Sequence, residues 1–185
     1  MRKAAFIDRD GVLNEDRAYV YRAADFEFIP GSVDALRTLR EAGYLLVVIT
    51  NQSGIARGLF READYRKLDE YMRERLAQAA VSLDSVQYCP HLPDAPILQY
   101  RRDCECRKPR AGMIRAAVEQ LGIELSQSIL VGDRRADIEA GRAAGVGRCF
   151  LVRSGQPLAA GDALLADGVY EDLAHCVGEL LRSGG

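Results

Sequence analysis

Short apolar runs alternate with amphipathic segments along the whole chain, and turn residues separate them. The apolar runs predict five strands, at Ala4–Ile7, Leu45–Ile49, Ser85–Tyr88, Ser128–Val131 and Arg148–Val152. The amphipathic segments predict five helices, at Ser32–Ala42, Glu62–Ala79, Gly112–Leu121, Ala136–Ala144 and Leu173–Leu181. Gly43, Gly122 and Gly145 follow three of these helices, as helix stop signals do. The alternation predicts an α/β fold, a doubly wound parallel sheet with helices on both faces.

Polar residues follow four of the predicted strands. Asp8 and Asp10 follow the first, Thr50 the second, Cys89 and His91 the third, and Asp133 the fourth. Ligands of open parallel sheets bind at the carboxyl ends of the strands. We therefore expect these side chains to meet at one edge of the sheet, in a single site.

Asp8 and Asp10 place two carboxylates at the end of the first strand. Neighbouring carboxylates repel each other unless a cation lies between them or their pKa values differ. A hard cation such as Mg²⁺ would accept Asp8 and a further carboxylate such as Asp133. Asp8 could then attack a phosphate, and Asp10 could act as general acid and base. The alternative for this motif alone is a solvated acidic turn.

A second cluster comprises Cys89, His91, Cys104 and Cys106. Three thiolates and one imidazole suit a closed tetrahedral Zn²⁺ site, which is normally structural. Arg107 and Lys108 follow directly, so we expect zinc to order the loop 89–106 and to fix both cations beside a bound phosphate. The alternative is a set of reduced thiols, with His91 on the surface.

Length and charge limit the remaining possibilities. At 185 residues, with no repeat or linker, residues 1–185 are expected to form one domain. A net charge of −2 provides no broad positive field, so nucleic acid is not an expected partner. The longest apolar run, 44–49, is too short to cross a membrane, and no secretory signal is evident. We expect a cytoplasmic protein that does not bind membranes.

Several other reactive side chains are interpreted as structural. Cys149 and Cys176 lie in apolar segments and are expected in the core. His175 is expected on a helix surface. The same holds for three arginines, Arg57, Arg61 and Arg66, although Arg57 lies close to the Thr50 loop.

Four motifs together resemble those of the haloacid dehalogenase superfamily. They are Asp8-Arg9-Asp10-Gly11, Thr50-Asn51-Gln52, Lys108-Pro109 and Gly132-Asp133-Arg134-Arg135-Ala136-Asp137, in the expected order. The resemblance implies an Mg²⁺-dependent phosphatase in which Asp8 is the nucleophile and Asp10 the general acid and base. Thr50 and Lys108 would hold the phosphate, and Asp133 would bind magnesium together with Asp8 and Asp10. Asp137 resembles an outer residue of the metal site.

Within this superfamily the zinc loop resembles that of two groups. One removes the 7-phosphate of a heptose 1,7-bisphosphate, and the other hydrolyses histidinol phosphate. The long loop between His91 and Cys104 favours the heptose group, and histidinol phosphate remains the alternative. The resemblance implies a phosphorylated sugar substrate, a capless fold and a monomer. The implied substrate contacts are Asp16, Arg17, Ala18, Tyr19, Thr50, Asn51, Gln52, Ser53, Arg107, Lys108 and Arg134.

The chain departs from the pattern of this group at three places. Arg110-Ala111 stands where His-Pro is familiar, Arg134 where lysine is common, and Val12 where threonine is frequent. The first two leave the chemistry intact but leave open which anomer is preferred. A third alternative is a phosphosugar-binding protein without turnover, although such a protein would not need a second carboxylate at Asp10.

Overall fold

The computed structural model describes residues 2–182 and contains a parallel sheet of six strands. The strands are β1 (Ala4–Ile7), β2 (Leu45–Asn51), β3 (Ser85–Cys89), β4 (Ile129–Gly132), β5 (Arg148–Val152) and β6 (Gly168–Tyr170). Their order across the sheet is β3-β2-β1-β4-β5-β6. β1 therefore lies between β2 and β4, so that Asp8, Thr50 and Asp133 come from three adjacent strands.

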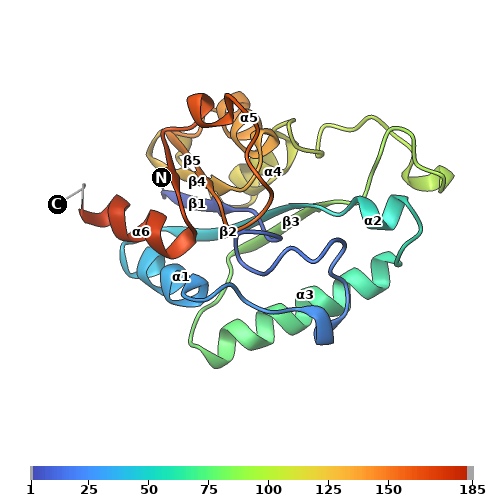
Figure 1. Ribbon diagram of the computed structural model, residues 1–185, viewed down its shortest axis with the longest axis horizontal. Coiled ribbons are helices and arrows are strands. Elements are labelled where there is room, and N and C mark those ends of the chain that lie inside the picture. The colour runs from blue at the N-terminus through green and yellow to red at the C-terminus, as the bar shows by residue number, and fades with distance from the viewer. Residues whose placement is uncertain (1, 183–185) are drawn as a thin grey trace.

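Helices cover both faces of the sheet (Figure 1). The α-helices are α1 (Ser32–Glu41), α2 (Ser53–Ala56), α3 (Glu62–Gln78), α4 (Gly112–Leu121), α5 (Arg135–Ala144) and α6 (Leu173–Arg182). Short 3-10 turns are η1 (Ala23–Asp25), η2 (Leu98–Tyr100), η3 (Leu125–Gln127) and η4 (Asp162–Leu165). α1, α3 and α6 pack on one face, and α4 and α5 pack on the other. The predicted doubly wound fold is confirmed.

The two faces of β1 explain this layering. Ala5 and Ile7 belong to the core beneath α1, α3 and α6, whereas Ala4 and Phe6 belong to the core beneath α4 and α5. Side chains alternate between the faces of a strand, so a strand covered on both sides is apolar throughout. The run Ala4–Ile7 is fully buried for this reason.

Two features of the sheet differ from the sequence-based expectations. The edge strand β6 was not predicted, because it has only three half-buried residues between Asp167 and Glu171 and pairs with β5 alone. β2 extends two residues further than predicted, because Thr50 and Asn51 continue the pairing with β3 although they are polar. The predicted strand ended at Ile49 because the prediction followed the apolar residues only.

The residues interpreted as structural lie where they were expected. Cys149 and Cys176 are fully buried, and His175 is exposed beside Asp172. None of the helices described between residues 2 and 182 is both long and apolar enough to cross a membrane. Within the same residues, the connection from β1 to β2 contains only η1 and α1 as regular elements, in keeping with the capless fold expected.

Candidate active site

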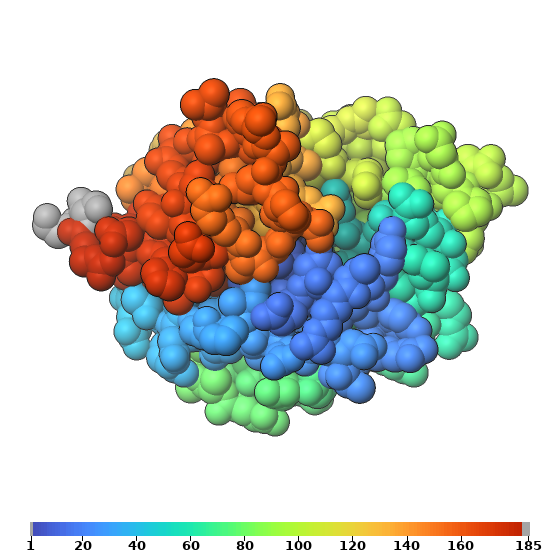
Figure 2. Space-filling view, viewed as in Figure 1, coloured from blue at the N-terminus to red at the C-terminus, as the bar shows by residue number. Residues whose placement is uncertain are grey.

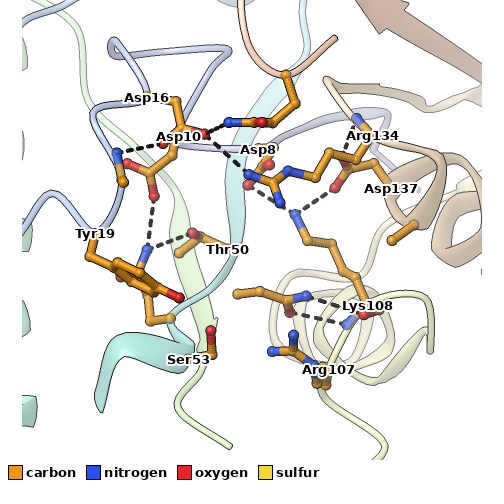
Figure 3. Close-up of a pocket in the computed structure, with 15 residues that line it drawn as sticks. Asp8, Asp10, Asp16, Tyr19, Thr50, Ser53, Arg107, Lys108, Arg134 and Asp137 are labelled. Carbon is orange, nitrogen blue, oxygen red and sulfur yellow. Dashed lines mark hydrogen bonds and ion pairs between the residues drawn. The ribbon is translucent and has the colours of Figure 1, made fainter. Parts of the chain in front are cut away.

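Asp8 and Lys108 form an ion pair at the carboxyl end of the sheet (Figure 3). The distance from Lys108 Nζ to Asp8 Oδ1 is 2.9 Å, and the same ammonium lies 2.5 Å from Asp137 Oδ1. It also donates a hydrogen bond to the Ile49 carbonyl. Each of the three charged side chains is nearly or fully buried. Lys108 is therefore held in one orientation, between two carboxylates and the end of β2.

Burial and the close charges perturb these groups strongly. Burial raises the pKa of Asp8 well above its usual value, and Lys108 offsets only part of that effect. Burial alone would lower the pKa of Lys108, but Asp137 and Asp8 raise it instead. Lys108 therefore remains charged at neutral pH. Lys108 does not fully neutralise the carboxylates of Asp8 and Asp137, so the site lacks positive charge.

Asp133 completes an acidic cluster with Asp8 and Asp137, whose carboxylate oxygens lie within 4.8 Å of one another. Asp133 Oδ2 accepts a hydrogen bond from the backbone N–H of Gln156 at 2.9 Å. Asp133 Oδ1 is buried and has no hydrogen-bond partner among the described residues. A buried carboxylate oxygen without a hydrogen bond, beside a second carboxylate, is a suitable donor set for a divalent cation. The residues therefore fit the magnesium site expected from the sequence.

Two glycines allow the surrounding loops to approach Asp133 closely. Gly11 has φ +86°, and a Cβ there would lie 2.6 Å from Asp133 Oδ2. A Cβ on Gly155 would lie 2.1 Å from the same oxygen. Because any larger residue would displace the carboxylate, both glycines are required by the geometry of this cluster.

Asp10 lies beside the Asp8 cluster and is held by three side chains. Arg9 forms a forked ion pair with it, with Nη2 2.9 Å from Asp10 Oδ2. Asn14 Nδ2 donates to Asp10 Oδ1 at 3.0 Å, and Gln52 Nε2 donates to Asp10 Oδ2 at 3.0 Å. Gln52 Nε2 also donates to Thr50 Oγ1 at 2.9 Å. Asp10 is therefore linked to the threonine that was expected to hold the phosphate.

Asn51 supports Lys108 from the neighbouring strand end. Its side-chain amide donates to the Lys108 carbonyl and accepts from the Lys108 backbone N–H, each at 3.1 Å. These two hydrogen bonds join β2 to the loop that follows the cysteine cluster. The position of Lys108 thus depends on β2 as well as on its own loop.

The cavity above Asp8 has a volume of about 320 Å³. Across its mouth, Asp16 accepts hydrogen bonds from Arg134 Nη2 at 3.1 Å and from Gln156 Nε2 at 2.6 Å. Figure 2 shows the corresponding segments, after β1 (blue) and after β5 (orange), in contact. Tyr19 lies at the side of the cavity and is 44% exposed. The lining residues are Asp8, Asp10, Asp16, Ala18, Tyr19, Thr50, Asn51, Gln52, Ser53, Arg107, Lys108, Arg134, Ala136, Asp137 and Gln156.

The cavity brings together the predicted substrate contacts with one exception. Arg17 does not line it, because its guanidinium pairs with Glu27 on the surface. Ala18 and Tyr19 both adopt positive φ angles, 54° and 61°, so the chain turns sharply after Arg17. The two side chains that follow enter the site, whereas Arg17 does not.

The loop 89–106 (yellow-green in Figure 2) projects from one end of the molecule, and the cysteine cluster joins its two ends, beginning at Cys89, the last residue of β3. Cys106 Sγ is 3.1 Å from Cys89 Sγ, 3.2 Å from Cys104 Sγ and 3.4 Å from His91 Nδ1. The neighbouring thiols of Cys89 and Cys104 lower the pKa of Cys106 to about 5, although burial opposes this. A lowered thiol pKa favours the thiolate, the form that binds metals. The four side chains fit a zinc ion.

Arg107 extends from this loop to the cavity. Its Nη1 donates to the His91 carbonyl at 3.3 Å, and it forms no ion pair with a carboxylate among residues 2–182. Lys108 and Arg134, by contrast, are both paired with aspartates. Arg107 is thus the lining cation whose charge is least compensated by the protein.

Three residues that contact the site residues, Gln156, Arg9 and Asn14, were not predicted from the sequence. Gln156 follows β5, and no strand-end signal marks it, since Ser154, Gly155 and Pro157 read as an ordinary loop. Arg9 belongs to the first motif and Asn14 follows it by three residues, but nothing in the sequence indicates that their side chains turn towards Asp10. Their roles depend on how the loop 8–14 folds back on the Arg9 carbonyl.

Comparison with known proteins agrees with this geometry. Residues 105–176 match the HAD-hydrolase-like family model. The chain is 48% identical to D-glycero-beta-D-manno-heptose-1,7-bisphosphate 7-phosphatase of Salmonella typhi, over 92% of this chain and 91% of that protein. The protein of the same name from Haemophilus influenzae is 46% identical over 94% of each chain.

Solved structures show the same relationship. The crystal structure of D,D-heptose 1,7-bisphosphate phosphatase from B. bronchiseptica, complexed with magnesium and phosphate, superposes with a TM-score of 0.81. It is 34% identical in sequence, and the match covers 98% of this chain and 99% of that one. The chain therefore belongs to the HAD-like hydrolases, in the family of the D-glycero-beta-D-manno-heptose-1,7-bisphosphate 7-phosphatases.

Proposed function

We propose that this protein removes the 7-phosphate of D-glycero-β-D-manno-heptose 1,7-bisphosphate through a phosphorylated Asp8. The observation that carries the proposal is the Asp8–Lys108 ion pair on the floor of the cavity, with Asp10 held beside it. The names of the similar proteins support the choice of substrate.

The reaction has two steps. In the first, a carboxylate oxygen of Asp8 attacks phosphorus and the bond between phosphorus and the sugar oxygen breaks. Asp10 donates its proton to that oxygen, so the sugar leaves as an alcohol. In the second step a water molecule attacks the aspartyl phosphate and gives a proton to Asp10. Phosphate leaves, and Asp8 is regenerated. Lys108 and Thr50 would hold the transferring phosphoryl group throughout.

Magnesium would be held by Asp8 and Asp133, with the Asp10 carbonyl as a third protein ligand. Asp133 Oδ1, which accepts no hydrogen bond among the described residues, and the raised pKa of Asp8 support this assignment. A divalent cation there supplies the positive charge that keeps both carboxylates ionised and offsets the charge of the phosphate. Asp137, which pairs with Lys108, is proposed to orient that lysine.

The cations at the mouth suit the second phosphate of the substrate. Arg107 has no carboxylate partner among the described residues, so its fork is available to the phosphate that does not react. Arg134, Asp16 and Tyr19 would contact the sugar hydroxyls, and the backbone of 50–53 would contact the reacting phosphate. The cavity is lined by both acids and cations, as a hydroxylated bisphosphate requires.

Zinc would occupy the site formed by Cys89, His91, Cys104 and Cys106. Gly112 packs against the Glu105 carbonyl, where an added Cβ would lie only 2.4 Å away. The loop is thereby pressed onto α4, and zinc would fix the segment that carries Arg107 and Lys108. Thiolates that must stay reduced also agree with the cytoplasmic location expected from the sequence.

A phosphate-release assay tests the proposal. We expect turnover of heptose 1,7-bisphosphate that depends on Mg²⁺, with histidinol phosphate turned over at least about a hundredfold less efficiently. The variant Asp10→Asn should lose turnover but still bind the bisphosphate in calorimetry, which separates catalysis from binding. Preference for histidinol phosphate, or unchanged turnover in Asp10→Asn, would refute the proposed substrate or mechanism respectively.

A further inference from the structure

Arg9 is one of the largest fully buried side chains of the protein, with 1% of its surface exposed. Its guanidinium donates to both oxygens of Asp10 and to the Val20 carbonyl at 2.9 Å. The ring of Tyr65 lies 5.7 Å from the guanidinium carbon. Burying an arginine is costly unless its charge is paired. Asp10 is its partner, so the two residues are tied together inside the protein.

Asn14 holds Asp10 from a second direction. It is fully buried, and its Nδ2 donates to Asp10 Oδ1 at 3.0 Å and to the Glu15 carbonyl at 2.9 Å. Neither Arg9 nor Asn14 lines the cavity, so neither is placed to touch a substrate. Both contact the Asp10 carboxylate from the protein interior and not from the cavity.

The contacts divide the two oxygens of Asp10. Oδ1 receives hydrogen bonds from Arg9 Nε, Arg9 Nη2 and Asn14 Nδ2, and it faces the buried side. Oδ2 receives Arg9 Nη2 and Gln52 Nε2, and Gln52 links it to Thr50 (Figure 3). Gln52 lines the cavity, whereas neither donor residue of Oδ1 does, so Oδ2 is the oxygen on the cavity side. Oδ2 lies on the side where the phosphate is expected.

We infer that Arg9 and Asn14 are positioning residues that orient Asp10 so that Oδ2 is the oxygen that exchanges the proton. This inference rests on the proposed function, because it concerns the acid and base of that reaction. In the first step, the proton on Oδ2 passes to the sugar oxygen as its bond to phosphorus breaks. In the second step, Oδ2 accepts a proton from the attacking water as phosphate leaves Asp8.

A purely structural role predicts a different result. The Arg9 side chain also donates to the Val20 carbonyl, so it helps to hold the loop after β1 in place. If that were its whole contribution, a variant would impair every substrate equally. If Arg9 instead positions the acid, the loss must depend on how much the leaving group needs a proton.

The experiment compares kcat/KM for heptose 1,7-bisphosphate and for p-nitrophenyl phosphate, whose leaving group departs without protonation. This parameter reports phosphoryl transfer to Asp8 and not the later hydrolysis of the phosphorylated enzyme. For Arg9→Met and Asn14→Leu we expect losses of about 100-fold and about 10-fold with the sugar bisphosphate, and less than about threefold with the aryl phosphate. Arg9→Lys, which keeps the charge but not the fork, should lie between wild type and Arg9→Met.

Arg40→Met is the matched control. It removes an arginine–aspartate pair of similar length, to Asp84 at 2.8 Å, whose two residues do not line the cavity. It should lower the melting temperature without changing the ratio of the two kcat/KM values. If Arg9→Met does not fold, Asn14→Leu and Arg9→Lys decide the question.

Equal losses for both substrates in the Arg9 and Asn14 variants would overturn the inference, and so would unchanged values. The proposed substrate is tested separately, by the wild-type protein. If wild type prefers another sugar phosphate, the same ratio is measured with that compound, and the inference about Arg9 stands or falls on its own.

Discussion

Replacing Asp133 by asparagine should make the metal-free protein more stable at pH 8 while abolishing its activity. Asp133 lies at the end of β4 with its side chain fully buried. One of its oxygens accepts no hydrogen bond among the described residues, and the carboxylates of Asp8 and Asp137 are close. In the absence of a divalent cation, the folded state must therefore carry a charge that its surroundings disfavour. The asparagine side chain would keep the hydrogen bond from the Gln156 amide without the charge.

The magnitude follows from the pKa. Burial, together with the charge of Asp137, raises the pKa of Asp133 from an ordinary value of 3.8 to about 6. The pKa of Asp133 is higher in the folded state than in the unfolded state, so the protonated form, present below pH 3.8, is the one compatible with folding. As the pH rises through 6 the carboxylate ionises in the folded state, and the free energy of unfolding falls by about 3 kcal/mol. This value already includes the opposing attraction of Arg134, 3.6 Å away, and asparagine leaves one amide group unpaired. We therefore expect a net gain of about 1–2 kcal/mol.

Urea unfolding in the presence of a chelator at pH 8 and at pH 4 measures this gain. The free energy of unfolding of Asp133→Asn should exceed that of wild type at pH 8, and the difference should disappear towards pH 4. Added Mg²⁺ should reverse the order, because only wild type gains binding energy, about 2.7 kcal/mol at a hundredfold excess over Kd. Phosphate release measured on the same samples should be absent in the variant.

Asp84→Asn is the matched control. This carboxylate pairs with Arg40 and accepts the Leu46 amide at 2.8 Å, so losing its charge should lower stability at pH 8. Two results would contradict this prediction: an Asp133→Asn variant no more stable than wild type at pH 8, or a stability advantage that does not change with pH. Either result would mean that the buried charge at Asp133 is already compensated by the protein.

Two further predictions concern the projecting loop. Arg107→Met should lower kcat/KM for heptose 1,7-bisphosphate by about 10- to 100-fold, because a charged hydrogen bond to the second phosphate is lost. The value for the 7-monophosphate should change much less, and equal losses for both substrates would contradict that role. Cys104→Ser should reduce bound zinc, measured by atomic absorption, and lower the melting temperature, because three ligands hold the ion less tightly. Unchanged zinc content and melting temperature would argue against a structural zinc site.

Much of the site could be predicted because its chemistry is tied to local features of the chain. The buried run of β1 ends at Asp8, that of β4 ends just before Asp133, and parallel strands must present these ends at one edge. The cysteine cluster was recognisable from residue types alone, since few other roles need three thiols and an imidazole so close together. The fold class followed from the alternation of strands and helices for the same reason.

The residues that carry chemistry, and the strand ends on which they lie, can be identified from the order of residues along the chain. How their side chains combine depends on the folded arrangement. Gln156 reaches Asp16 across 140 residues of chain, and Lys108 reaches the Ile49 carbonyl across 59, so both contacts depend on strand order and loop path. Arg9 and Arg17 each follow an aspartate in the sequence. Arg9 is nevertheless buried against Asp10, whereas Arg17 pairs with Glu27 at the surface. The physical reason is that the direction of a side chain depends on backbone angles set by packing, which local composition does not determine.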